Sequence, residues 1–523
     1  MWPQPLNPLS SLALSALVGA LPLLVVLVLM GWLRKSGLLA SACGLLTTLF
    51  LAKTVWGMPL PLAGWSIAFG FGYALWSILW LVFGGLWLYQ LAVATGSFDL
   101  LREWIAGFTG RDHCTQAILV AFCFGSLLEG CAGFGAPVAI TSFLLIGFGF
   151  ERMKAITVSL IANTAPVAFG ALGLPIVALA GVTGIEVSKL SAAVGRQLPF
   201  LSFVLPAYLA WIIAGPKGLR RSWPVALLAG AAFAFTQALT SNLWGPYATD
   251  LLSALISVLV VVSYLRFSGR KSAVPSKTAL SARSATIAWL PWLILCVVMV
   301  AWSYFGLAQQ HAIVWHIPQL HNGVFITLYQ KPYAAIFSFQ PLSAGTGVMV
   351  AVFLTALCLR ASPRSVGSAG WSALKQLTVP ALTVLFIVAL AYLYNYSGMA
   401  YTVGAAVAHS GAVFPIVSSY LGWMACFLSG SDTAANLLFG NLQVAAAHQL
   451  HINPVLLAAT NSSGAVAGKM ISPQNIAIGV TTVGLIGQEG KVLHKTLWHS
   501  LLFAGIVGLI ALLQAYYLPG MIP

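Results

Sequence analysis

Long apolar runs dominate the chain, and short polar or basic segments separate them. A helix that spans a bilayer needs about 20 predominantly apolar residues. The runs that approach this length cover residues 12–33, 38–55, 66–92, 198–215, 223–240, 248–267, 287–308, 343–359, 376–396 and 496–518. The first run is too long for a signal peptide and is followed by Arg34 and Lys35, so we expect it to be retained as a spanning helix.

Two further zones, 115–182 and 400–488, are apolar but interrupted by Gly, Pro, Asn and Ser. Each has room for two or more short helices. Together the runs predict an all-α polytopic membrane protein with about 12–14 transmembrane helices. The basic, Ser-rich segment 268–284 divides the chain almost in half. We therefore expect an N-terminal transmembrane half over 1–267, a cytoplasmic linker over 268–284 and a C-terminal transmembrane half over 285–523.

The composition excludes a soluble fold. Of the 523 residues, 60% are apolar and only 6% are charged, whereas soluble domains carry about 25% charged residues. The net charge of +15 is spread between the apolar runs, which indicates membrane topology and not a nucleic-acid partner. The seven cysteines form no C-x-x-C pair, so we expect neither disulfides nor a cysteine metal site.

The distribution of Lys and Arg predicts the orientation. If Arg34 and Lys35 lie in the cytoplasm, the segments expected inside hold many more basic residues than those expected outside. The outside segments hold Lys53, Lys189, Arg196 and Lys331. Cytoplasmic loops are enriched in Lys and Arg, so we predict that the N-terminus lies outside the cytoplasm.

The polar segment 309–341 is then also outside, as a loop with or without an interfacial helix. His311, His316 and His321 within it would suit a metal ion, but their loose spacing favours an ordinary surface loop. We therefore predict no metal site.

The two interrupted zones share a spaced pattern of residues. The matching positions are Asn163, Gly170 and Pro175 in the first zone and Asn461, Gly468 and Pro473 in the second. An acid surrounded by small residues precedes each pattern, Glu129 in the first zone and Asp432 in the second. Such matched interruptions are typical of secondary transporters built from inverted repeats with broken or re-entrant helices.

Broken backbone at membrane depth is tolerated only against protein or a wet cavity, and the N-termini of half-helices favour an anionic substrate. The alternative is that the breaks are kinks that allow close helix packing.

Four charged residues lie within or at the edge of apolar segments, where an ionisable group at mid-bilayer costs roughly 2.5–3.5 kcal/mol. Glu129 and Asp432 would carry a coupled proton, because a carboxyl group removed from water holds a proton more readily. Each would otherwise form a structural ion pair, and Asp432 would otherwise cap a helix. Lys469 would bind a substrate carboxylate or pair with Asp432. Arg196 would clamp a carboxylate or extend to the membrane interface.

Histidines in apolar segments offer a second route for protons. His409 and His448 would relay protons near neutral pH, although an isolated histidine in such a segment is more often packed and hydrogen-bonded. The sequence holds no P-loop for ATP, no haem- or cluster-binding cysteines and no hydrolase motif. We therefore expect no enzyme activity and no cofactor.

The segments 128–141, 163–170, 194–200, 429–433 and 468–474 and the last residues of the chain resemble those of the bacterial L-lactate permease family. The resemblance spans nearly the whole chain. It implies an inner-membrane symporter that takes up L-lactate, D-lactate or glycolate together with protons. Cys131 stands where the family more often has Ala, and 309–341 is shorter than is usual, which leaves lactate and glycolate open as the preferred substrate.

Together these patterns predict alternating access, with the substrate between the two interrupted zones. Lys469 or Arg196 would supply the counter-charge to the carboxylate. Glu129 or Asp432 would carry the proton, with His409 as a further relay. The residues expected to hydrogen-bond the substrate are Asn163, Asn461, Ser462 and Ser463.

Other functions remain open from the sequence. A sodium-coupled carboxylate carrier would use the same backbone carbonyls and Asn and Ser side chains as ion ligands. A non-transporting membrane subunit or receptor would accumulate no substrate. A membrane enzyme is the least favoured, because no catalytic constellation is present. The lipid bilayer is the one further partner that the sequence indicates, and it leaves the oligomeric state open.

Overall fold

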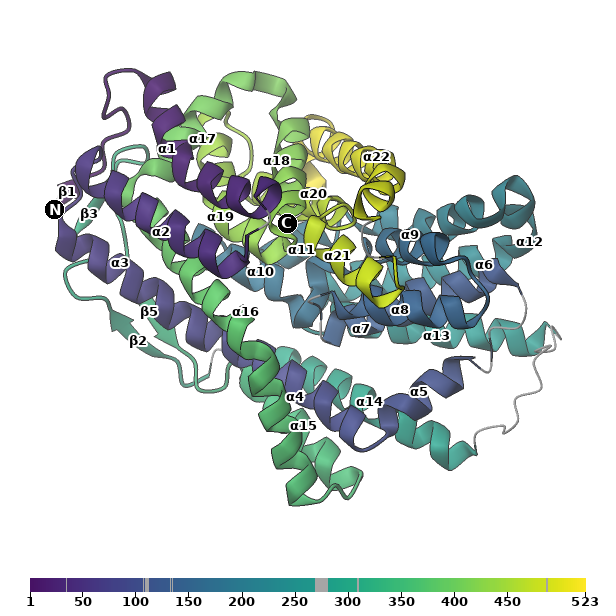
Figure 1. The fold of residues 1–523 in the computed structure, drawn as a ribbon. Helices are drawn as coiled ribbons and strands as arrows, with labels where there is room; N and C mark the ends of the chain where they lie inside the picture. Colours follow the sequence, from purple (N-terminus) through teal and green to yellow (C-terminus); the bar gives the residue numbers. More distant parts are fainter. Residues whose placement is uncertain are drawn as a thin grey trace.

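The computed structural model describes residues 1–33, 35–106, 108, 112–131, 133, 135–268, 281–307, 310–485 and 488–523. These residues form a bundle of helices with a small strand region at the end where the N-terminus lies (Figure 1). The elements before the predicted linker are β1 (Trp2–Pro3), α1 (Leu12–Leu27), α2 (Gly37–Thr54), α3 (Leu60–Tyr73), α4 (Trp80–Ala94), α5 (Ser97–Ala106), α6 (His113–Gln116), α7 (Gly125–Cys131), α8 (Ala136–Gly147), α9 (Arg152–Ala162), α10 (Gly170–Thr183), α11 (Val187–Val194), α12 (Pro199–Leu243) and α13 (Thr249–Phe267).

The elements after the predicted linker complete the bundle. They are α14 (Ala282–Tyr304), β2 (Ile313–His316), β3 (Val324–Ile326), β4 (Lys331–Pro332), β5 (Ile336–Phe339), α15 (Ala344–Cys358), α16 (Pro363–Ser397), α17 (Met399–Val407), α18 (Phe414–Ser429), α19 (Asp432–Gln449), α20 (Pro454–Lys469), α21 (Pro473–Thr482) and α22 (Glu489–Tyr516). The basic linker lies mostly in residues 269–280, outside the described residues, as do Arg34 and Arg111, so these predictions stay untested.

The prediction of a helical polytopic membrane protein is confirmed. Among the described residues, ten helices are long and apolar enough to cross a membrane, and α9 together with Val167–Thr183, bent by 63°, makes up to eleven. The predicted number is higher because α12 contains two predicted spans and is broken at Ala214 and Gly215. In addition, the predicted span 343–359 is the shorter helix α15.

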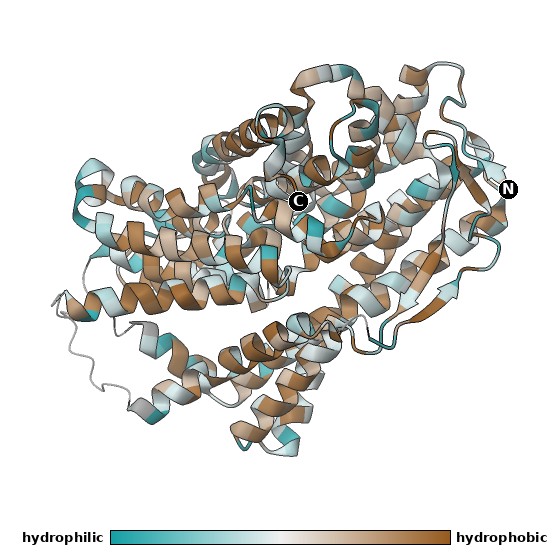
Figure 2. Ribbon diagram, turned by 180° about the vertical axis from the view of Figure 1, so that it is seen from behind, coloured by the Kyte–Doolittle hydropathy of each residue, from teal (hydrophilic) through white to brown (hydrophobic). Residues whose placement is uncertain are grey.

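The outward faces of the bundle suit a lipid environment. Large apolar side chains such as Leu46, Phe235 and Trp498 are exposed, and apolar residues run along most of the helices in Figure 2. In water, such a continuous apolar surface would promote aggregation, whereas in a bilayer it contacts acyl chains. The surface therefore agrees with a chain that crosses the membrane many times.

The segment 309–341 forms short strands in its described part, so of the two expected forms the one with an interfacial helix is not found there. β2 pairs with β5 in antiparallel register, and β3 pairs with β4. The β-branched and aromatic residues of β2 and β5 favour this geometry. β1 pairs with β3, which puts the N-terminus and this segment on one side, as the orientation prediction requires. Within the described residues, no group of three or more His, Cys, Asp or Glu is placed to hold a metal ion.

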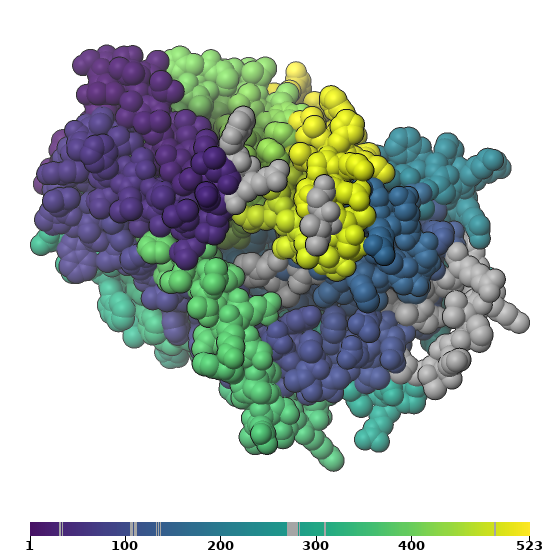
Figure 3. Space-filling view, in the orientation of Figure 1, coloured from purple at the N-terminus to yellow at the C-terminus, as the bar shows by residue number. Residues whose placement is uncertain are grey.

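The two predicted halves are interleaved in space. α16 packs against α2, α3 and α4, and α10 packs against α19. The C-terminal helix α22 also contacts α9, and in Figure 3 its yellow surface adjoins the blue surface of the first half. Residues far apart in the sequence therefore meet in the centre of the bundle, where the interrupted zones lie.

The helices of the first interrupted zone end inside the bundle. α7 ends at Cys131, and α8 begins after Gly135, whose φ of +82° favours glycine. α9 ends at Asn163. Residues Ala171, Leu172 and Gly173 at the start of α10 are left-handed, so the chain changes direction there before it continues as a helix.

The second zone is interrupted in a related way. α18 ends at Gly430, which has a φ of +71°, and Ser431 caps the N-terminus of α19. α20 ends at Lys469, and α21 begins at Pro473. Proline suits this first position because an N–H group there would have no acceptor within the helix. Both zones therefore place helix ends, whose last backbone groups need partners from outside the helix, in the protein interior.

Candidate functional site

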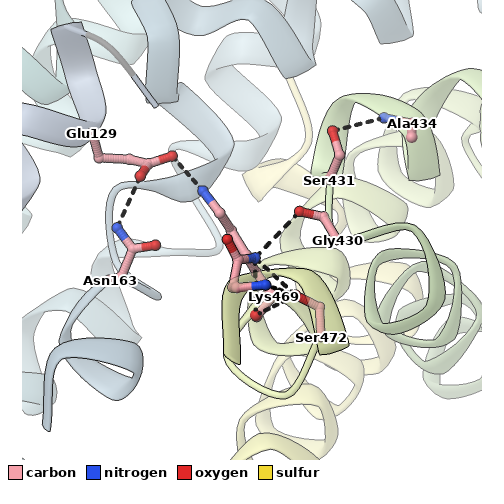
Figure 4. A network of polar contacts seen from close by, with 8 residues as sticks. Glu129, Asn163, Gly430, Ser431, Ala434, Lys469 and Ser472 are labelled. Atoms are coloured by element: carbon pink, nitrogen blue, oxygen red, sulfur yellow. Dashed lines mark hydrogen bonds and ion pairs between the residues drawn. The ribbon is translucent and has the colours of Figure 1, made fainter. Parts of the chain in front are cut away.

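A buried ion pair joins the two interrupted zones. The Nζ atom of Lys469, the last residue of α20, lies 2.5 Å from Oε1 of Glu129 on α7 (Figure 4). The two side chains are 8% and 3% exposed, respectively. Two charges can be buried at this depth only if each has a partner. The pair therefore confirms that Glu129 contacts a basic residue from another helix, which was one of the two interpretations of its role.

The surroundings of Glu129 hold its carboxylate in place. Asn163 donates from Nδ2 to the second oxygen, Oε2, at 3.0 Å. Gly170 is packed so closely that a Cβ atom on it would lie 2.8 Å from Oε1. Both carboxylate oxygens therefore have a donor, and position 170 has no room for a side chain.

Lys469 is held by the start of the next helix. Its carbonyl oxygen accepts hydrogen bonds from the Ser472 hydroxyl and the Asn475 side chain. Ser472 also caps α21. A cation is favoured at the C-terminal end of a helix by the helix dipole, so the position of Lys469 at the end of α20 reduces the cost of its burial.

Asp432 lies beside this pair but does not bind Lys469. Its Oδ2 atom accepts from the Ser462 hydroxyl at 2.9 Å, whereas Oδ1 is without a partner in the described part of the chain. Ser431, and not Asp432, accepts the hydrogen bond that caps α19. The described part of the structure therefore contains neither a Lys469–Asp432 ion pair nor a helix cap formed by Asp432.

A network of buried amides connects the second zone to α10. Asn436 donates to the Ser462 hydroxyl and to the carbonyl of Pro175, both at 3.1 Å. Asn461 donates to Oδ1 of Asn436 at 2.9 Å and accepts from Gln443. Asn461 thus holds helices together, whereas its sequence counterpart in the first zone binds the acid.

The remaining predicted site residues, which are Ser463, Arg196 and His409, have different surroundings. The Ser463 hydroxyl is buried and lacks a partner among the described residues. Arg196 donates to Asn242 at 2.8 Å and to the carbonyl of Met521 at 3.0 Å, and His409 is exposed in the 3₁₀ segment Ala408–Val413. The structure therefore brings Glu129, Asn163 and Lys469 together, with Asp432 and Ser462 nearby, but neither Arg196 nor His409.

Asp250 belongs to this site, although sequence reasoning passed over it. It lies in the first turn of α13 and is 1% exposed. A Cβ atom on Gly130 would lie 2.9 Å from its Cβ atom, and it interacts electrostatically with Glu129 and Lys469. The signal was present, because Asp250 is a charged residue inside the predicted span 248–267.

Comparisons with known proteins place the chain among carboxylate permeases. The family model described as L-lactate permease matches residues 15–518. The chain is 39% identical to glycolate permease GlcA of Escherichia coli K12, covering 100% of this chain and 99% of the relative. It is 38% identical to the L-lactate permeases of Escherichia coli K12 and of Bacillus subtilis, with both chains fully covered.

Two solved transporter structures match the chain at low sequence identity. The YdaH transporter of Alcanivorax borkumensis matches with a TM-score of 0.48 at 16% identity, covering 88% of this chain and 89% of that chain. MtrF of Neisseria gonorrhoeae matches with a TM-score of 0.45 at 12% identity, covering 86% and 83%.

Proposed function

Because the chain belongs to the L-lactate permease family, we propose that it takes up L-lactate and related 2-hydroxy monocarboxylates, such as D-lactate and glycolate, together with protons. Family membership and the membrane-spanning helices make it a multi-pass transporter and not an enzyme. We further propose that it acts in the bacterial inner membrane with its N-terminus in the periplasm. The excess of basic residues in the segments expected inside supports this orientation.

The observation that carries the proposal is the Lys469–Glu129 pair between the two interrupted zones. A small carboxylate has the same charge and the same two acceptor oxygens as the Glu129 side chain. It would therefore compete with Glu129 for Lys469. The guanidinium of Arg196 already donates to Asn242 and Met521, so Lys469 is the better counter-charge of the two candidates.

Competition for Lys469 would also couple substrate to a proton. When the substrate takes the ammonium group, Glu129 keeps only its hydrogen bond from Asn163. A buried carboxylate without a cation is costly and tends to take up a proton. Asp432, which also lies beside Lys469 with one oxygen unpartnered in the described structure, is the second candidate for this proton.

The hydroxyl group of the substrate would be bound by neutral side chains near the pair. Ser462 and Ser463 are buried at adjacent positions of α20, and the Ser463 hydroxyl has no other partner in the described part. Asn163 would bind the substrate once Glu129 moves. Asn461 would act through its network with Asn436.

Uptake of labelled L-lactate, D-lactate and glycolate into vesicles with an imposed pH gradient tests the function. We expect accumulation when the outside is acidic, and none when the gradient is collapsed. One anion with one proton is electrically neutral, so a membrane potential at fixed pH should drive no uptake.

Replacing sodium by choline separates the alternatives. Uptake that depends on sodium and not on pH would favour a sodium-coupled carrier. The complete absence of accumulation for all three substrates would reject the transport proposal.

A further inference from the structure

Asp250 is buried without a hydrogen bond to its carboxyl group in the described part of the chain. It is 1% exposed, and across the described residues neither of its carboxyl oxygens has a hydrogen-bond partner. A buried ionised carboxylate without hydrogen bonds or a bound cation is among the most costly groups in a protein and becomes neutral by binding a proton. Ionisable residues inside membrane segments therefore usually serve a function.

The groups around Asp250 do not change this conclusion. Glu129 on α7 and Lys469 on α20 interact with it electrostatically, and the Lys469 ammonium group is already bound to Glu129. Cys131 on α7 is also close, and Tyr247 precedes the helix. Lys469 is thus shared between Glu129 and Asp250, and these surroundings favour the neutral form of Asp250.

A cavity of about 390 Å³ is lined partly by the strand region and partly by the segment before α13. Its lining includes Tyr247, Ser343, Ile336 and Phe337. Ser343 is 8% exposed, and its hydroxyl has no hydrogen-bond partner in the described chain. A water molecule or a ligand in the cavity could therefore form a hydrogen bond with it.

Tyr247 is part of the cavity lining. It lies three residues before Asp250, and its neighbour Pro246 contacts Gly173 in the left-handed segment of α10. Gly170, three residues earlier, touches Glu129. The segment before α13 therefore lines the cavity and packs on the part of α10 that touches Glu129.

We infer that Asp250 holds a proton in this conformation and delivers it to Glu129 during uptake. In the relay, the O–H bond of Asp250 breaks as its proton passes to a water molecule between the two carboxyl groups, and that water gives one of its own protons to Glu129 after the substrate has taken Lys469. Asp250 then takes up a new proton from water. The start of α13 favours the transient carboxylate through the helix dipole. This inference rests on the proposed proton-coupled uptake.

Asp250→Asn tests the relay, because it keeps the shape of the side chain and removes the exchangeable proton. We expect labelled L-lactate to exchange in counterflow as in the wild type, while accumulation driven by a pH gradient is lost and the pH profile of uptake is flat. Asp99→Asn is the matched control, because the Asp99 side chain is 63% exposed on α5, and should behave like the wild type.

The results separate the relay from the function. Absence of transport by the wild type would reject the proposed uptake itself. If the wild type transports and Asp250→Asn still accumulates substrate normally in a pH gradient, the relay alone is rejected. Loss of counterflow by a folded Asp250→Asn variant would also reject the relay, because it would indicate a structural role.

A second measurement on the wild type keeps the relay testable if the variant does not fold. A hydrophobic carbodiimide reacts with protonated carboxyl groups in apolar surroundings, and peptide mass spectrometry locates the product. We expect modification of Asp250 at neutral pH that decreases as the pH is raised. Modification of Asp432 without any at Asp250 would overturn the inference.

Discussion

The two interrupted zones share a residue pattern but differ in what they contribute to the site. Asn163 ends α9 and donates to Glu129, whereas Asn461 lies within α20 and joins a network of amides. Ala171 is left-handed, whereas Lys469, at the same place in the pattern, ends a helix and reaches Glu129. The first zone thus supplies the acid and the second supplies the cation.

This difference teaches that the repeat preserves the breaks and not the chemistry. In both zones a glycine precedes the interruption and a proline follows within the next helix, because these residues permit and stabilise a helix break. The side chains beside the breaks are free to diverge. One charge from each zone then makes a pair that depends on the relative position of the zones, which is what a transporter changes during its cycle.

The largest effect should come from removing the cation of the second zone. Lys469→Met leaves Glu129 without its partner, and breaking a buried pair in this way costs about 3–5 kcal/mol. We expect uptake to be abolished and thermal stability in detergent to fall. The double variant Glu129→Gln/Lys469→Met should recover much of the stability but none of the uptake. Unchanged stability of the single variant would contradict the buried pair.

The acid of each zone can be tested against its counterpart. Glu129→Gln should abolish accumulation driven by a pH gradient while leaving counterflow exchange, because the variant binds substrate but no coupled proton. Asp432→Asn should retain accumulation if Glu129 alone carries the proton. Vesicle uptake and counterflow measure both properties. Accumulation that survives in both variants would show that neither acid carries the coupled proton.

Glycines at matching positions should respond differently. In Gly170→Ala the new Cβ atom would press on the Glu129 carboxylate, so we expect the KM for substrate to change, with a stability loss of about 1–3 kcal/mol. In Gly468→Ala it would overlap the Trp423 carbonyl on α18, so we expect a loss of folded protein without a selective change in KM.

Gly64→Ala is the control for both, because no atom lies within 4 Å of the added carbon and alanine favours a helix. Thermal unfolding and uptake kinetics separate the three variants. Equal changes in KM for Gly170→Ala and Gly468→Ala would argue against the different roles of the two zones.

The smallest effect on uptake is expected from a substitution that does not touch the Lys469–Glu129 pair. His409 is exposed, and its ring lies 3.2 Å from the carbonyl oxygens of Ala405 and Ala406, not beside the ion pair. His409→Ala should therefore leave the pH profile of uptake unchanged. A shift of the profile would place a second proton-binding group at this end of the bundle.

Much of the architecture could be predicted because hydrophobic length is a local property. The predicted spans correspond to helices, and both interruptions lie where Gly, Pro and Asn indicated them. Glu129 and Lys469 stood out because a charge in an apolar run is rare at any position. The strand region was missed, since short strands depend on pairing partners such as β1 and β3, which lie far apart in the chain.

The roles of the site residues were less predictable. Asn163 and Asn461 occupy equivalent places in the sequence pattern, yet one contacts the acid and the other packs between helices. Asp250 was not among the predicted site residues, although it lies near the start of a predicted span, and the surrounding helices bury it. Neither difference is encoded within a few residues of the side chain concerned.

The sequence by itself determined that the chain crosses the membrane many times, that helices break in two zones, and which rare charges lie in apolar surroundings. These properties follow from hydrophobicity and backbone preference over short stretches. Only the tertiary structure decided that Lys469 pairs with Glu129 across 340 positions of sequence, and that Asp250 stands beside them unpaired in the described structure. The physical reason is that a buried charge finds its partner by the packing of whole helices, which no local pattern specifies.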